Sequence, residues 1–207
     1  MIVKKFRLHI FIYALCSAVV CVYLYIDFAV ARQILLFVAG VISLLYTLPI
    51  FGDGRRLRDF SFIKILLISC TWTMVTDGLI LYEAGFSYHT VALASLERFC
   101  YILAITIPFD VRDMEIDEAQ HVPTLATILG ASKSKFISYA LFIISGIAAV
   151  AQGRYDTNSL IAILTCYTLS LLAVFYTHRE RSDYWYTGII DGLMMTPLLL
   201  LLLLNAR

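Results

Sequence analysis

The sequence predicts an all-α fold, a polytopic bundle of seven transmembrane helices that forms a single domain over residues 1–207. Composition favours it first, because hydrophobic residues make up 61% of the chain and charged residues only 15%, whereas soluble domains carry about 25% charged residues. Mean hydropathy is correspondingly high, at +0.85. The third observation is that seven apolar stretches each approach the roughly 20 residues that a helix needs to cross a bilayer.

The predicted spans cover residues 9–27, 33–51, 61–82, 88–109, 134–151, 159–176 and 185–204. The first follows three basic residues, as a signal peptide would, but it is long and lacks a small-residue cleavage site, so we expect it to be retained. Aromatic residues, which favour membrane interfaces, delimit the third, fourth and seventh spans. No Pro/Gly-rich linker divides the chain, and the only long loop predicted is 110–133.

Basic residues predict the orientation, because Lys and Arg are retained on the cytoplasmic side of short loops. Three lie on one side in this topology, Arg32, Arg154 and Arg207. Twelve lie on the other: Lys4, Lys5, Arg7, Arg55, Arg56, Arg58, Lys64, Arg112, Lys133, Lys135, Arg179 and Arg181. We therefore expect an integral protein of the cytoplasmic membrane with its N-terminus inside and its C-terminus outside.

Two function classes lose support at this stage. No basic surface interleaved with aromatic residues indicates nucleic-acid binding, so we expect no nucleic-acid partner. The five cysteines all fall within apolar spans, where they are expected to be small buried hydrophobic residues and not disulfides or metal ligands.

Five carboxylates fall within nine residues directly after the fourth apolar stretch: Asp110, Asp113, Glu115, Asp117 and Glu118. On a helix, Asp110, Asp113 and Asp117 lie within an arc of about 60°. Acids at this spacing repel one another unless a cation lies between them, and Mg²⁺ is usually held by a few carboxylates together with substrate phosphates. We predict a magnesium and phosphate site at the membrane edge, with solvated or capping acids as the alternative.

A second loop on the same side carries Arg55, Arg56 and Arg58 after two glycines, and Lys64 follows it. Guanidinium groups match phosphate oxygens in a bidentate manner, and Lys adds a point charge. The positive-inside bias would place such residues there without any ligand, so both explanations remain open.

Residues 105–117, followed by Thr124-Leu125 and by residues 128–130, resemble the second aspartate-rich motif of the UbiA-type membrane prenyltransferases. The family pattern is Asp-x-x-Asp-x-x-x-Asp, followed by a Gly and by Thr-Leu-Pro. Residues 46–49, with the basic stretch 55–64, resemble the Tyr and basic loop that contact the diphosphate in that family. The resemblance covers nearly the whole chain.

The resemblance implies that Mg²⁺ bridges aspartate-rich loops and a prenyl diphosphate, and that an aromatic or lipid acceptor captures the prenyl group. It implies a catalytic and metal-binding role for Asp110, Asp113 and Asp117. The substrate-binding candidates are Tyr46, Arg55, Arg58, Lys64, Arg112 and Asp191.

The chain also departs from the family pattern. Its seven spans correspond to the last seven of nine, so the other motif, Asn-Asp-x-x-Asp-x-x-x-Asp, has no counterpart. His121 replaces the expected Gly, Pro123 the usual Lys, and Ala126 the Pro of Thr-Leu-Pro. Three explanations remain open: a truncated chain, a diverged relative with another task, or a subunit whose partner chain supplies the missing motif.

Ionisable residues within the spans are costly unless they are paired or hydrated. Glu97 and Arg98 are adjacent, and neighbours on a helix point about 100° apart, so we expect Arg98 to pair with Asp77 or Asp191 across helices. Asp191 lies about 9 Å inside the last span, close enough to line the mouth of a cavity.

The leading hypothesis is a UbiA-like prenyltransferase homologue that transfers a prenyl group with Mg²⁺, truncated or inactive forms included. The alternative is a non-catalytic membrane scaffold or binding subunit that keeps the same fold. A small transporter is less favoured, because the sequence shows no internal duplication.

Overall fold

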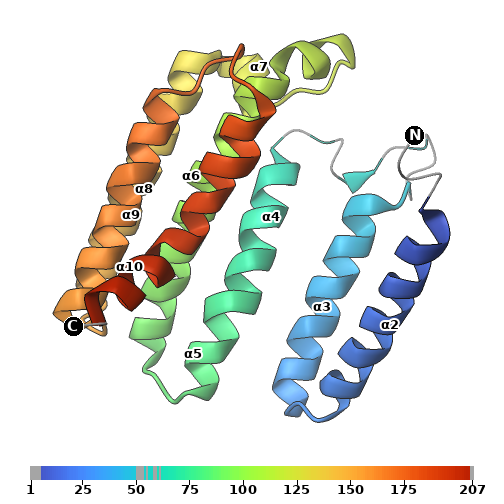
Figure 1. The fold of residues 1–207 in the computed structure, drawn as a ribbon, viewed down its shortest axis with the longest axis vertical. Helices are drawn as coiled ribbons and strands as arrows, with labels where there is room; N and C mark the ends of the chain where they lie inside the picture. Colours follow the sequence, from blue (N-terminus) through green and yellow to red (C-terminus); the bar gives the residue numbers. More distant parts are fainter. Residues whose placement is uncertain (1–5, 50–53, 55, 58–59, 61, 206–207) are drawn as a thin grey trace.

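The computed structural model describes residues 6–49, 54, 56–57, 60 and 62–205. Every regular element within these residues is helical (Figure 1). Within the same residues, seven helices are long and apolar enough to cross a bilayer, which is compatible with the predicted membrane bundle and indicates an integral membrane protein. The first long helix begins and the last one ends at opposite ends of the bundle (Figure 1).

The first half of the chain contains α2 (Arg7–Ile26), α3 (Val30–Thr47), α4 (Ile63–Thr73), the π-helical turn η2 (Met74–Gly78) and α5 (Leu79–Glu83). The second half contains α6 (Tyr88–Ala119), α7 (Leu125–Leu129), α8 (Ala131–Ala151), α9 (Thr157–Phe175), the π-helical turn η3 (Trp185–Ile190), the 3₁₀ turn η4 (Asp191–Met195) and α10 (Thr196–Asn205). The third and seventh predicted spans are therefore each built from three consecutive helical segments.

The fourth span differs most from the prediction, because α6 continues for 32 residues to Ala119. The predicted loop 110–133 is thus wrong over its first ten residues. Pro108 lies inside α6 without ending it, as proline does in membrane helices where neighbouring groups satisfy the freed backbone carbonyl. The acidic residues therefore sit on rigid helix.

α6 ends in a Schellman motif at His121, whose φ is 57°. The amide of Val122 donates to the carbonyl of Asp117 at 2.8 Å, and the amide of His121 donates to that of Glu118 at 3.2 Å. Glycine is the residue that adopts this left-handed conformation without steric cost, so His121 holds a strained backbone where α6 ends.

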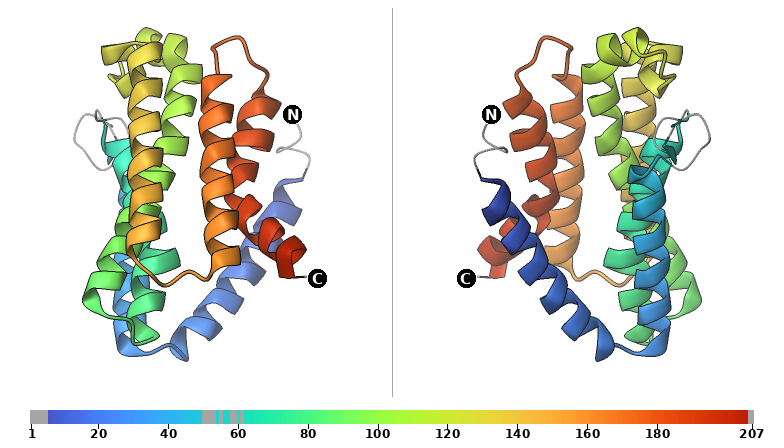
Figure 2. Two further views of the ribbon diagram at one scale, coloured as in Figure 1. Left: turned by 90° about the vertical axis from the view of Figure 1, so that its left-hand side faces the viewer. Right: turned by 90° about the vertical axis from the view of Figure 1, so that its right-hand side faces the viewer.

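α6 forms the centre of the bundle and packs mainly against α8 and α4. Its buried face meets α8, α9 and the last span in one core, which includes Tyr101, Ile105, Phe142, Tyr167 and Tyr186. By contrast, α2 buries no residue, and Figure 2 shows it inclined to the other helices. Apolar side chains exposed in this way suit a lipid surrounding.

A buried polar network surrounds Glu97, toward the end of α6 that is farther from the acids. The Glu97 carboxylate accepts hydrogen bonds from Tyr167 at 2.5 Å, from Tyr155 at 3.0 Å and from the side-chain amide of Gln152. Burial, and then the nearby carboxylate of Glu97, raise the pKa of the Tyr155 phenol, so the phenol remains protonated and can donate.

Beside this network, the guanidinium of Arg98 pairs with Asp77 at 2.5 Å. Arg154 lies 3.8 Å from the other oxygen of Asp77. The expectation that Arg98 reaches across to another helix is confirmed, and its partner is Asp77, not Asp191. The ion pair joins η2 to α6 and to the turn between α8 and α9.

Candidate functional site

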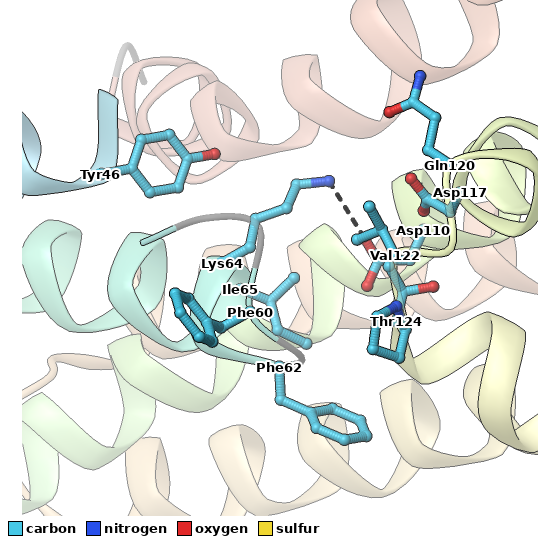
Figure 3. A pocket seen from close by; sticks show the side chains of 11 residues that line it. Tyr46, Phe60, Phe62, Lys64, Ile65, Asp110, Asp117, Gln120, Val122 and Thr124 are labelled. Carbon is cyan, nitrogen blue, oxygen red and sulfur yellow. Dashed lines mark hydrogen bonds and ion pairs between the residues drawn. The ribbon is translucent and has the colours of Figure 1, made fainter. Parts of the chain in front are cut away.

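A cavity of about 200 Å³ lies where α6 ends, and its charged and phenolic side chains come from three helices. Figure 3 shows Tyr46 of α3, Lys64 of α4 and the aspartates of α6 facing the same space. The remaining lining comes from the start of α4 and from the turn after α6. The described residues of the lining are Tyr46, Phe60, Phe62, Lys64, Ile65, Asp110, Asp117, Gln120, Val122, Pro123 and Thr124.

Asp110 is the most deeply buried acid of this pocket, with a side chain only 2% exposed. The ammonium of Lys64 lies 3.3 Å from its Oδ1 atom. A buried carboxylate without a cation is strongly unfavourable, so the contact with Lys64 compensates this charge. Asp110 lies on the buried face of α6, and Lys64, the second residue of α4, supplies the ammonium.

Asp117 lies two helical turns after Asp110 and lines the same pocket. Its Oδ2 atom is buried and has no hydrogen-bond partner among the described residues. Lys64 is near enough to act electrostatically on both carboxylates. Two negative charges therefore share one ammonium, and an acceptor oxygen remains available to a cation.

The beginning of α4 also faces the pocket, through Phe62, Lys64 and Ile65. Phe62 has a left-handed φ of 59°, and no side chain caps the helix. The first amides of a helix carry a partial positive charge and can bind anionic oxygens. The pocket thus combines carboxylates for a metal with an ammonium and a helix N-terminus for an anion.

Asp113 does not line this pocket, although sequence spacing placed it with Asp110 and Asp117. Its oxygens accept from Arg112 at 2.7 and 3.0 Å, and the Arg112 guanidinium lies over the rings of Phe109 and Tyr186. No group of three or more Asp, Glu, His or Cys side chains gathers as a metal site within the described ranges. The described part of the pocket therefore presents the carboxylates of Asp110 and Asp117, with the charge of Asp113 acting from outside it.

The other candidates fall in different places. Arg112 turns to Asp113 and lies 3.8 Å from Asp183, outside the pocket lining. Asp191 is exposed at the start of η4 and is not part of the lining either. Arg55 and Arg58 lie outside the described residues. Of the substrate-binding candidates, Tyr46 and Lys64 are brought to the pocket.

Several lining residues were not singled out from the sequence, namely Phe60, Phe62, Ile65, Gln120 and Val122. Pro123 was named only as a departure from the family pattern. Thr124 belonged to the motif without an assigned role, and it caps α7 through a reciprocal pair of contacts with Thr127. The sequence could have indicated these residues by their closeness along the chain to the acidic motif or to Lys64. The end of a helix and the turn that follows it lie on the same surface.

An apolar groove, also about 200 Å³, adjoins the pocket between α3 and α4. Tyr46 belongs to both linings, so its ring lies where the polar and apolar spaces meet. The groove continues along the helices and is lined by Ile42, Ser43, Tyr46, Thr47, Leu67, Ile68, Thr71 and Trp72. This arrangement suits an amphipathic ligand with an anionic head and a hydrocarbon tail.

Comparison of the chain with protein-family models, with curated proteins and with solved structures finds no match in any of the three.

Proposed function

We propose that this chain is a UbiA-like prenyltransferase homologue, which binds a prenyl diphosphate with Mg²⁺ and transfers the prenyl group to an aromatic or lipid acceptor. The observation that carries the proposal is the joining of a pocket containing Asp110, Asp117 and Lys64 to an apolar groove through Tyr46. A prenyl diphosphate has the same division between a charged head and an apolar chain.

The donor set fits a magnesium ion. Mg²⁺ sites commonly use one or two carboxylates and complete their coordination with water and substrate phosphates. Asp110 and Asp117 supply the carboxylates, and the buried Oδ2 of Asp117 is an acceptor without a partner among the described residues. When bound, Mg²⁺ would supply positive charge that stabilises the diphosphate as a leaving group.

The chain's own groups would divide the remaining work. Lys64 and the uncapped beginning of α4 bind phosphate oxygens. The groove between α3 and α4 would shield the apolar chain from water, and Tyr46 lies where pocket and groove meet. Asp113 adds negative charge near the metal without lining the pocket.

We place the pocket end of the bundle at the cytoplasmic face, with the N-terminus inside and the C-terminus outside. The support is the excess of Lys and Arg, twelve against three, on the side that carries Lys64 and Arg112. A partner chain that supplies a second aspartate-rich motif would complete a second metal position.

Isothermal titration of the purified protein with Mg²⁺ and farnesyl diphosphate tests the binding site. We expect Asp110→Asn and Asp117→Asn each to weaken binding at least about tenfold, because a metal ligand is lost. Glu115→Gln is the matched control, since Glu115 is exposed on the same helix and outside the pocket. Equal binding by all four proteins would remove the site assignment.

A non-catalytic binding subunit is the second candidate function. It is favoured by the absence of a three-carboxylate metal group within the described parts of the chain. Transfer of a radiolabelled prenyl group to acceptors in a lipid extract separates the two: binding accompanied by transfer identifies the enzyme, and binding without transfer identifies the subunit.

A further inference from the structure

We propose that Lys64 is a built-in counter-ion of the aspartate pair, which a divalent cation displaces so that the ammonium becomes available to the diphosphate. The inference rests on the proposed function, since it assigns an order of events to the same pocket. Metal binding would come first, release of Lys64 from Asp110 would accompany it, and capture of the phosphate oxygens would follow.

The ion pair is built asymmetrically. Asp110 is held on the buried face of α6, with a side chain 2% exposed, whereas the Lys64 side chain is 32% exposed. The distance between Nζ of Lys64 and Oδ1 of Asp110 is 3.3 Å, which exceeds the roughly 2.7–2.9 Å of a strong charge-assisted hydrogen bond. The carboxylate is therefore the fixed partner, and the ammonium is the one that can move.

The charges also favour exchange. Lys64 supplies one positive charge to Asp110 and Asp117 together, so the pair keeps an excess negative charge. The buried Oδ2 atom of Asp117 has no hydrogen-bond partner among the described residues, although the side chain of Thr124 lies close enough to act on this carboxylate. A divalent ion carries enough charge to balance two carboxylates, whereas a single ammonium balances one.

A displaced ammonium would stay within the site. Among the described residues that line this pocket, Lys64 is the basic one, and its flexible stem allows the charge to move while α4 stays in place. In Figure 3 the hydroxyl of Tyr46 faces the ammonium from the side away from the aspartates. Lys64 can thus turn from Asp110 toward the junction of pocket and groove, where the diphosphate is proposed to lie.

The first experiment measures Mn²⁺ binding to the purified full chain by electron paramagnetic resonance, without any diphosphate. Removing the competing ammonium in Lys64→Gln is expected to tighten Mn²⁺ binding about tenfold. Lys133→Gln removes a charge from an exposed position at the start of α8 and should bind like the wild type. A Lys64→Gln variant that binds Mn²⁺ no more tightly than the wild type overturns the displacement.

The second experiment uses the wild-type protein and so does not depend on folding of a variant. The acylation rate of the Lys64 amine, followed by mass spectrometry, should rise severalfold with Mn²⁺ alone and fall again when inorganic pyrophosphate or farnesyl diphosphate is added. An unchanged rate with Mn²⁺ overturns the displacement by the metal. A rise without protection by either diphosphate overturns the proposed ligand instead, so the two failures are distinguishable.

Discussion

The carboxylates toward the two ends of α6 differ in how completely they are hydrogen-bonded. Glu97 accepts from three donors, Tyr167, Tyr155 and Gln152. At the other end, Asp110 has one long contact with Lys64, and an oxygen of Asp117 has no partner among the described residues. Saturated networks hold helices together, whereas an incompletely paired acid in a pocket is poised for a ligand.

The largest loss of stability is expected when the hydrogen-bonded network around Glu97 is broken. Glu97→Ala leaves Tyr167 and Tyr155 without their acceptor, and each buried unsatisfied group costs about 1–3 kcal/mol. We expect a loss of about 3 kcal/mol in the free energy of unfolding, measured by denaturation in mixed micelles. A variant as stable as the wild type would show that the network does not hold the bundle.

The next prediction concerns the unsaturated end and the response to metal. If Mg²⁺ binds only the folded protein, a concentration of about 100 times its dissociation constant stabilises by about 2.7 kcal/mol. We expect this gain in wild type, its reversal by EDTA, and its loss in Asp117→Asn. Thermal unfolding with and without Mg²⁺ checks it, and Glu115→Gln should keep the response. Stabilisation that persists in Asp117→Asn would place the metal elsewhere.

The ion pair beside the network should matter less than the network itself. Asp77→Asn leaves Arg98 and Arg154 without their carboxylate, and both guanidiniums retain some access to water or headgroups. We expect a loss of about 2 kcal/mol in the free energy of unfolding, with no change in diphosphate binding at the far end of α6. A large loss of binding would indicate that the two ends are coupled.

The smallest effect tests the end of α6. His121 holds a left-handed φ of 57°, which is unfavourable for a side chain by about 1–2 kcal/mol, partly offset by the greater entropy that glycine loses on folding. His121→Gly is therefore expected to stabilise the protein by about 0.5 kcal/mol. Destabilisation in equilibrium unfolding would mean that the imidazole makes contacts outweighing the backbone strain.

Helix positions were predictable because hydrocarbon length and apolar composition dictate them. The seven spans agree with the long helices to within a few residues, apart from α6. The extension of α6 was missed, since charged residues after Phe109 resembled a loop when hydropathy alone was considered. Their helical spacing carried the correct signal, and the turn at His121, not the end of the apolar run, ends the helix.

Part of the pocket was also predictable. Asp110, Asp117 and Lys64 were named from the pattern of charges and Tyr46 from the family resemblance, and all line one cavity. Asp113 was expected to join them, but spacing on a helix states only which side chains share a face. It does not include competing partners, and Arg112, held between Phe109 and Tyr186, draws Asp113 away.

The sequence by itself determined that the chain lies in a membrane, where its helices run, and which acids share a helical face, because these properties depend on local composition and on helical geometry. Only the tertiary structure decided which charges meet. Pairing of Arg98 with Asp77, enclosure of Glu97 by tyrosines, and the contact of Lys64 with Asp110 each require helices far apart in sequence to pack side by side. In a medium of low dielectric, that packing decides whether a buried charge is compensated or left available to a ligand.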